Sequence, residues 1–246
     1  MLSFLKNHPF AVKAFFESSI VLTFAVPKEE LEHLIPPCLT LDTFNDKWAF
    51  IAVAMVQTKG LRPKGFPAIA GNDFFLIGYR VFVRYTNNAG KRLRGLYILK
   101  SETDKKKIEF LGNIFTHYNY ATTDIIRSKN NITTKITSFS SNFEIETMTG
   151  GAEISLPKNS PFADWKEARR FAGPLPFTFT YIASTKKVLI IEGVREHWQP
   201  LPAQVINYRI SFIDSLELKN VQLANAFVIQ NIPYYWKKGK TEKWNG

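Results

Sequence analysis

Lys100 is the residue whose type and position offer the clearest chemistry. In the segment LRGLYILK it follows Leu96 and Ile98 at alternate positions, so a strand would place all three side chains on one face. A lysine in an apolar pocket is biased toward the neutral amine, which can attack a carbonyl to form a Schiff base. The alternative is that the side chain reaches solvent or forms an ion pair with Glu102 or Asp104, which is the commoner outcome at a strand end.

Arg80 interrupts an apolar segment, FFLIGYRVFV, in which Phe74, Leu76 and Phe82 share its face. An arginine keeps its charge, so its burial requires an anion beside it. That anion can be a carboxylate of the protein, in a structural ion pair, or the carboxylate of a substrate held by two parallel hydrogen bonds. The segment therefore predicts either an ion pair or an anion clamp at Arg80.

Three further residues are candidates for substrate binding. Glu192 lies within VLIIEGVREH on the same face as apolar neighbours, where a carboxylate needs a cationic partner such as Arg80 or Lys100. His117 and Tyr118 follow a predicted helix. Their polar groups can supply a proton donor, or they can simply bond the backbone of the adjoining loop, which is the interpretation we favour.

The net charge of +11 favours anionic partners. The basic residues are spread over turn-like segments, so solvated loops explain them better than a nucleic-acid surface does. The cluster Tyr234-Tyr235-Trp236 beside Lys237-Lys238 suits base stacking, but a C-terminal strand with a frayed basic tail explains it more simply. We expect a small-molecule ligand and no nucleic acid, and the sequence leaves assembly into a homo-oligomer open.

Several kinds of site are not encoded. There is no Gly-rich phosphate loop, no G-x-S-x-G elbow and no H-E-x-x-H helix, and four histidines do not suggest a multi-histidine metal site. We therefore expect no metal and no cofactor. The single cysteine, Cys38, is expected to be a packed residue. With no signal peptide and no membrane-spanning apolar run, the sequence predicts a soluble, cytoplasmic protein.

Short strands must position these residues. Phe occurs 21 times, and segments rich in aromatic and β-branched residues recur along the chain. They predict strands at 18–26, 48–56, 74–85, 94–100, 132–139, 143–148, 177–183, 188–197, 204–213 and 224–229. Helices are predicted from Pro27, over 107–118, and over 161–172 with Ser160 as the cap. This is an α+β pattern, mainly antiparallel β, in one domain over residues 1–246 built on a large curled sheet or closed barrel.

The order of several short motifs resembles the acetoacetate decarboxylase-like superfamily, and more closely its YqjF-like branch, a domain of unknown function. The resemblance implies a cone-like, closed or partly closed antiparallel β-barrel with a central pocket and a few peripheral helices. In the decarboxylase, a barrel lysine forms a Schiff base with a β-keto acid, and Lys100 lies on roughly the corresponding strand. The motifs are His8-Pro9-Phe10, the helix 26–37, the strand 41–44 with Trp48, and the segments 60–63, 79–83, 95–104 and 116–120.

Two departures from the decarboxylase pattern bear on the chemistry. The decarboxylase has two adjacent lysines after a proline, whereas Ser101 follows Lys100 here, and a glutamate expected shortly before Arg80 is replaced by the apolar residues 76–78. The leading hypothesis is a cofactor-independent barrel that binds a small organic acid or carbonyl compound. Lys100 would be its catalytic amine for lyase or decarboxylase-type chemistry, with Arg80 as anion clamp and Glu192 as counter-charge. The alternatives are a non-catalytic barrel for an apolar or aromatic molecule and, third, a nucleic-acid-associated protein.

Overall fold

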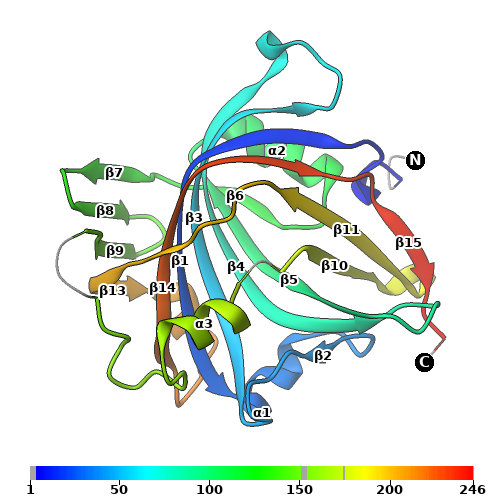
Figure 1. Ribbon diagram of the computed structural model, residues 1–246. Helices are drawn as coiled ribbons and strands as arrows, with labels where there is room; N and C mark the ends of the chain where they lie inside the picture. Colours follow the sequence, from blue (N-terminus) through cyan, green and yellow to red (C-terminus); the bar gives the residue numbers. More distant parts are fainter. Residues whose placement is uncertain (1–3, 151–153, 174, 246) are drawn as a thin grey trace.

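The main element of the fold is a large sheet that curls into a ring (Figure 1). The computed structural model describes residues 4–150, 154–173 and 175–245. The strands of the ring follow one another in the order β14, β1, β3, β4, β5, β10 and β11, and β11 pairs again with β14, which closes the ring. Their bounds are β1 Val12–Pro27, β3 Trp48–Pro63, β4 Asn72–Thr86, β5 Arg92–Thr103, β10 Phe177–Ile182, β11 Lys187–Arg195 and β14 Gln222–Trp236.

Four short strands complete this sheet. They are β2 Thr40–Leu41 beside β4, β6 Tyr120–Thr122 beside β5, β12 Leu201–Pro202 beside β14 and β15 Lys240–Lys243 beside β11. The pairings of β5 with β10 and with β6 are parallel, and the other pairings are antiparallel. Such a ring leaves few free strand edges, which limits unwanted pairing with other chains.

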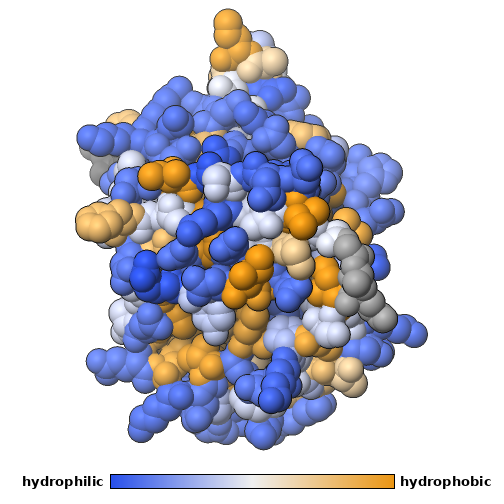
Figure 2. All heavy atoms as spheres, turned by 90° about the vertical axis from the view of Figure 1, so that its left-hand side faces the viewer, coloured by the Kyte–Doolittle hydropathy of each residue, from blue (hydrophilic) through white to orange (hydrophobic). Residues whose placement is uncertain are grey.

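A second, four-stranded sheet covers part of the outer face of the ring. Its order is β13, β9, β8, β7, and its strands are β7 Ile126–Lys129, β8 Thr133–Ser138, β9 Phe143–Met148 and β13 Gln204–Ile210. Ile136 and Ile145 of this sheet belong to the same buried cluster as Leu22, Met55 and Ile77 of the ring. The opposite face of the small sheet looks toward solvent and is mostly hydrophilic, with isolated hydrophobic side chains (Figure 2).

The central part of β3 is buried on both of its faces, and its sequence reflects this. Every residue from Ala49 to Thr58 is buried. A strand with two buried faces carries a nearly continuous apolar run instead of an alternating one, as in AFIAVAMV.

Aromatic side chains fill one end of the ring. Phe44, Phe50, Phe82, Phe162 and Phe171 pack with neighbouring ring centroids 5.0 to 5.9 Å apart. Aromatic contacts of this kind add to the stabilisation that burial alone provides. This aromatic plug closes one end of the interior, so any ligand space must lie toward the other end.

The helices lie at the periphery. The longest is α2, Lys106–Phe115, and it is followed by α3, Trp165–Phe171, which contributes Phe171 to the aromatic plug. The short helices are α1 Lys28–Leu31 and α4 Ser211–Asp214, and the 3-10 turns are η1 Leu5–Asn7, η2 Glu32–Leu34, η3 Ala68–Ala70 and η4 Ala183–Thr185. None of the helices in the described ranges has the length and apolar character needed to cross a membrane.

The predicted fold class is confirmed: the chain is mainly antiparallel β, in a ring-like sheet with few helices. Three local predictions are wrong. The helix predicted over 161–172 begins at Trp165, because Asp164, not Ser160, accepts the capping hydrogen bond, from the backbone of Glu167. The strand predicted over 204–213 ends at Ile210. The C-terminal tail is not frayed, since β15 pairs with β11.

Candidate functional site

A cavity of about 400 Å³ lies inside the ring, beside the aromatic plug. Its walls come from strands of the ring and from α2, and they are mainly apolar. Among the residues that form them are Phe16, Val56, Phe74, Leu76, Ile98 and Leu111. The volume falls within the range of pockets that bind small organic molecules.

Arg80 is the central polar group of this cavity. Alternation along β4 places Phe74, Leu76 and Arg80 in its lining, and Phe82 continues the same face into the aromatic plug. The guanidinium folds back along the strand over Gly78, where an added Cβ would lie 3.0 Å from both Nε and Nη2. The predicted common face of these residues is confirmed.

The charge of Arg80 has no protein counter-ion in the described part of the chain. No carboxylate there forms an ion pair with it, and its buried Nε donates no hydrogen bond. Burial lowers the pKa of Arg80 from its ordinary value, but a guanidinium does not lose its proton in proteins. Of the two alternatives the sequence left open, the structural ion pair is therefore not formed.

A second arginine, Arg195 of β11, also lines the cavity. Its Nη2 donates to the carbonyl of Leu175 at 3.1 Å, and its Cζ lies 4.4 Å from the centre of the Trp198 ring and 5.6 Å from that of Tyr234. The charge of Arg195 adds to the lowering of the pKa of Arg80. Within the described lining, no Asp, Glu or Lys faces these two cations.

Three tyrosines line the same cavity as the two arginines. Tyr118, Tyr120 and Tyr234 all line the cavity, and Tyr120 packs on α2 at Gly112, where a Cβ would lie only 2.4 Å from its ring. Burial raises the pKa of Tyr120 to about 12 and also raises the pKa of Tyr118. Both hydroxyls therefore stay protonated at neutral pH and can donate hydrogen bonds.

Two other buried polar atoms of the lining have no hydrogen-bond partner among the described residues. These are Nε1 of Trp198 and Nδ1 of His8. Burial lowers the pKa of His8, so its imidazole is neutral. Buried polar groups are nearly always paired, so these unpaired atoms mark a polar part of the cavity wall.

Lys100 lies outside this cavity. A β-bulge separates Tyr79, which pairs with Lys100, from Arg80, which pairs with Ile98. The extra residue moves Lys100 to the outer face while Leu96, Ile98 and Ser101 line the interior, so the predicted common face of Lys100, Leu96 and Ile98 is wrong.

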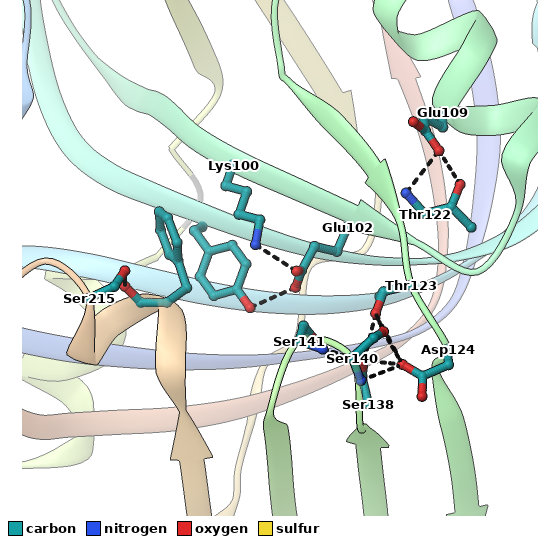
Figure 3. Close-up of polar contacts among 12 residues, drawn as sticks. Lys100, Glu102, Glu109, Thr122, Thr123, Asp124, Ser138, Ser140, Ser141 and Ser215 are labelled. Atoms are coloured by element: carbon teal, nitrogen blue, oxygen red, sulfur yellow. Dashed lines mark hydrogen bonds and ion pairs between the residues drawn. The ribbon is translucent and has the colours of Figure 1, made fainter.

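The Lys100 side chain is instead part of a polar cluster between the ring and α4. Its Nζ lies 2.7 Å from Oε1 of Glu102, which confirms the ion pair named as the alternative, and the hydroxyl of Tyr79 donates to Oε2 at 2.9 Å (Figure 3). The ammonium also lies 5.2 Å from the centre of the Phe212 ring. These contacts hold the amine in a charged cluster and away from the cavity.

The sequence model of one family, DUF2071, described as an uncharacterized conserved protein, matches residues 14–233. The chain belongs to the DUF2071 family. No protein of curated function matches it.

Solved structures similar to this DUF2071 protein share its fold at low sequence identity. The acetoacetate decarboxylase of Legionella pneumophila superposes with a TM-score of 0.61 at 11% identity, over 96% of this chain and 89% of that chain. The enduracididine biosynthesis enzyme MppR superposes with a TM-score of 0.60 at 8% identity, over 96% of this chain and 88% of that chain. An acetoacetate decarboxylase-like enzyme from Sphingomonas wittichii RW1 superposes with a TM-score of 0.59 at 8% identity, over 96% of this chain and 93% of that chain. The fold is thus of the acetoacetate decarboxylase-like type.

The other predicted site residues lie in different places in the DUF2071 structure. Tyr118 joins Arg80 in the cavity, but Glu192 binds Lys237, with 2.9 Å between the ammonium and its carboxylate, and lies outside the lining. Nε2 of His117 lies 3.5 Å from Oδ1 of Asn7, and the ring does not line the cavity. The expected pairing of Glu192 with Arg80 or Lys100 is therefore wrong.

Several polar cavity residues were not predicted as site residues, among them His8, Tyr120, Arg195, Trp198 and Tyr234. Arg195 lies three positions after Glu192 and therefore on the opposite face of β11. The alternation of VLIIEGVREH was the sequence signal that could have identified Arg195.

Within the described ranges, no three His, Cys, Asp or Glu side chains gather closely enough to hold a metal ion. Cys38 is half-buried, and burial raises the pKa of its thiol to about 11, in keeping with the packed role expected for it.

Proposed function

We propose that this DUF2071 protein binds a small organic acid in the ring cavity, with Arg80 as the residue that holds its carboxylate. The observation that carries the proposal is a half-buried arginine whose Nε is buried without a hydrogen-bond partner and beside which no carboxylate of the described residues lies, in a cavity whose lining offers hydrogen-bond donors. Buried charges in proteins are normally paired, and a ligand carboxylate would supply the missing partner.

The surroundings of Arg80 support a carboxylate more than a neutral ligand. Arg195 adds a second positive charge near it, and the protonated hydroxyls of Tyr118 and Tyr120 add donors. A hydrogen bond to a charged group contributes about 1.5–3 kcal/mol. Two or three such bonds around one carboxylate are sufficient to select an acid over the matching alcohol or amide.

Schiff-base chemistry at Lys100 is the alternative, and we do not expect it. The amine is held by Glu102 on the outer face of the sheet, so it would have to break that ion pair and cross the sheet to reach a ligand in the cavity. The chain shares its fold with an acetoacetate decarboxylase, but no lysine lies in the described cavity lining to supply a Schiff-base amine.

A calorimetric titration tests the proposal. Hexanoate and benzoate should bind to the wild-type protein, and the matching alcohols should bind at least tenfold more weakly. Arg80→Gln should weaken acid binding by about 10- to 100-fold, the equivalent of one charge-assisted bond. Lys100→Gln is the matched control and should leave the affinity unchanged.

Two outcomes would contradict the proposal. One is equal affinity of the wild type and the Arg80→Gln variant for the acids. The other is a mass adduct on Lys100 after borohydride treatment with a keto acid, since a reducible Schiff base there would establish the lysine chemistry instead.

A further inference from the structure

The shape of the cavity deepens the proposed function, on which this inference rests. We infer that the ligand is an amphiphilic monocarboxylic acid with a medium-length apolar tail, bound with its carboxylate at Arg80 and its tail pointing away from the aromatic plug.

The first argument is size. A volume of about 400 Å³ corresponds to about 13 water-sized groups at ~30 Å³ each. A three- or four-carbon oxo acid has about six or seven groups of this size, so it would fill only about half of this space and would leave apolar wall without contacts. Close packing is the norm in protein interiors, and unfilled apolar space forfeits dispersion contacts. The cavity therefore suits a ligand with a substantial apolar body.

The second argument is that, along β4, the charge of Arg80 lies at one end of the cavity and apolar side chains line the wall on the other side of it. Beyond Arg80 the strand face continues into the plug at Phe82, so the interior is filled on that side. On the other side, Leu76 and Phe74 line the cavity. The guanidinium lies over Gly78, and the four residues from there to Phe74 correspond to ~13 Å of strand. The head of the ligand is thus confined to one end.

The third argument is the wall formed by α2. Helix α2 presents Ile108, Leu111 and Phe115 to the cavity, whereas Phe110 of the same helix is 67% exposed. Arg62, the other arginine of the lining, donates hydrogen bonds to the backbone carbonyls of Gly60 and Phe66 at 2.7 and 3.2 Å. The wall around Phe74 is thus mainly apolar, with Thr58 and Asn72 as polar neighbours, and the two arginines at the proposed head site are Arg80 and Arg195 among the described lining residues.

Straight-chain acids of increasing length provide the test, because each added methylene buries apolar surface. Butanoate, hexanoate, octanoate, decanoate and dodecanoate should bind to the wild-type protein with dissociation constants that fall about fourfold for each methylene. The gain should stop once the tail extends beyond Phe74, ~13 Å from the head. Each acid is compared with the alcohol of equal length.

Two variants of α2 locate the tail. Leu111→Trp fills the apolar part of the cavity and should weaken decanoate at least tenfold while leaving butanoate within about twofold. Phe110→Trp alters the exposed face of the same helix and should change neither acid. Thermal unfolding of both variants checks that the fold is kept.

The outcomes separate this inference from the proposed function. Affinity that does not rise with chain length, in a protein whose acid binding still depends on Arg80, overturns the amphiphilic class and leaves the acid site in place. Alcohols that bind as tightly as acids, or an Arg80→Gln variant that binds as tightly as the wild type, overturn the acid site itself.

Discussion

Replacement of Arg80 by methionine should stabilise the ligand-free protein, although it should abolish acid binding. No carboxylate among the described residues lies beside the half-buried Arg80, and its buried Nε has no acceptor. A buried unsatisfied polar group costs about 1–3 kcal/mol. The cavity has room for water near the charge, which reduces that cost, so the free energy of unfolding should rise by about 1–2 kcal/mol. For a chain of this length, the melting temperature should rise by ~2–8 °C.

Arg84→Met is the matched control on the same strand. Nε of Arg84 lies 2.5 Å from Oδ1 of Asp42, whose side chain is fully buried, and Nε of Arg94 lies 2.6 Å from Oδ2. Removing one partner of a buried pair costs about 3–5 kcal/mol, and since Arg94 would remain beside Asp42, we expect a loss of about 2–4 kcal/mol. The same substitution should thus change stability in opposite directions at two positions of β4.

Urea unfolding followed by tryptophan fluorescence measures both effects, with linear extrapolation to water. Added octanoate should raise the unfolding midpoint of the wild type, because a ligand that binds only the folded state stabilises that state. It should leave the unfolding midpoint of Arg80→Met unchanged. A loss of stability in Arg80→Met comparable to that in Arg84→Met would refute the reasoning, since it would mean that the protein itself already compensates the charge of Arg80.

Two further predictions concern Gly78 and Asp124. Gly78→Ala places a Cβ 3.0 Å from the guanidinium of Arg80, so octanoate should bind roughly tenfold more weakly, by the loss of one charge-assisted bond; an unchanged dissociation constant would count against this geometry. Hydrogen bonds from Ser138 and Ser140 hold the pKa of Asp124 well below its ordinary value. The unfolded chain therefore takes up this proton first as the pH falls below ~4, and stability decreases. Asp124→Asn should flatten that decrease in acid unfolding curves, and equally steep curves would show that this carboxylate is not responsible.

Alternation in the sequence was sufficient to predict the sheet and the position of Arg80. The side chains of Phe74, Leu76, Arg80 and Phe82 follow a period of two without interruption, and the structure keeps them on one face. The same reasoning failed at Lys100, because a bulge adds one residue to β5 and reverses the face of all that follows it. A bulge leaves no reliable trace in a single sequence.

The rest of the site depends on contacts between distant parts of the chain. Arg195 and Tyr234 are neighbours only because β11 pairs with β14, the pairing that closes the ring. Arg195 and Arg80 line the same cavity from two strands that do not pair, and the local pattern of either strand says nothing of this. The basic residues after Trp236 suggested a frayed tail for the same reason, since β11, the strand that orders them, lies far away in the sequence.

The central claim is that Arg80 holds a ligand carboxylate, and the pKa of that carboxylate in the complex tests it most directly. Octanoate labelled with carbon-13 at the carboxyl group can be titrated in the complex by NMR. A nearby guanidinium stabilises the ionised form, so the account predicts a pKa below that of free octanoate for the wild type, and a shift in the opposite direction for any acid still bound by Arg80→Gln. A raised pKa in the wild-type complex would contradict the account, because it would mean that the carboxyl group lies against apolar wall.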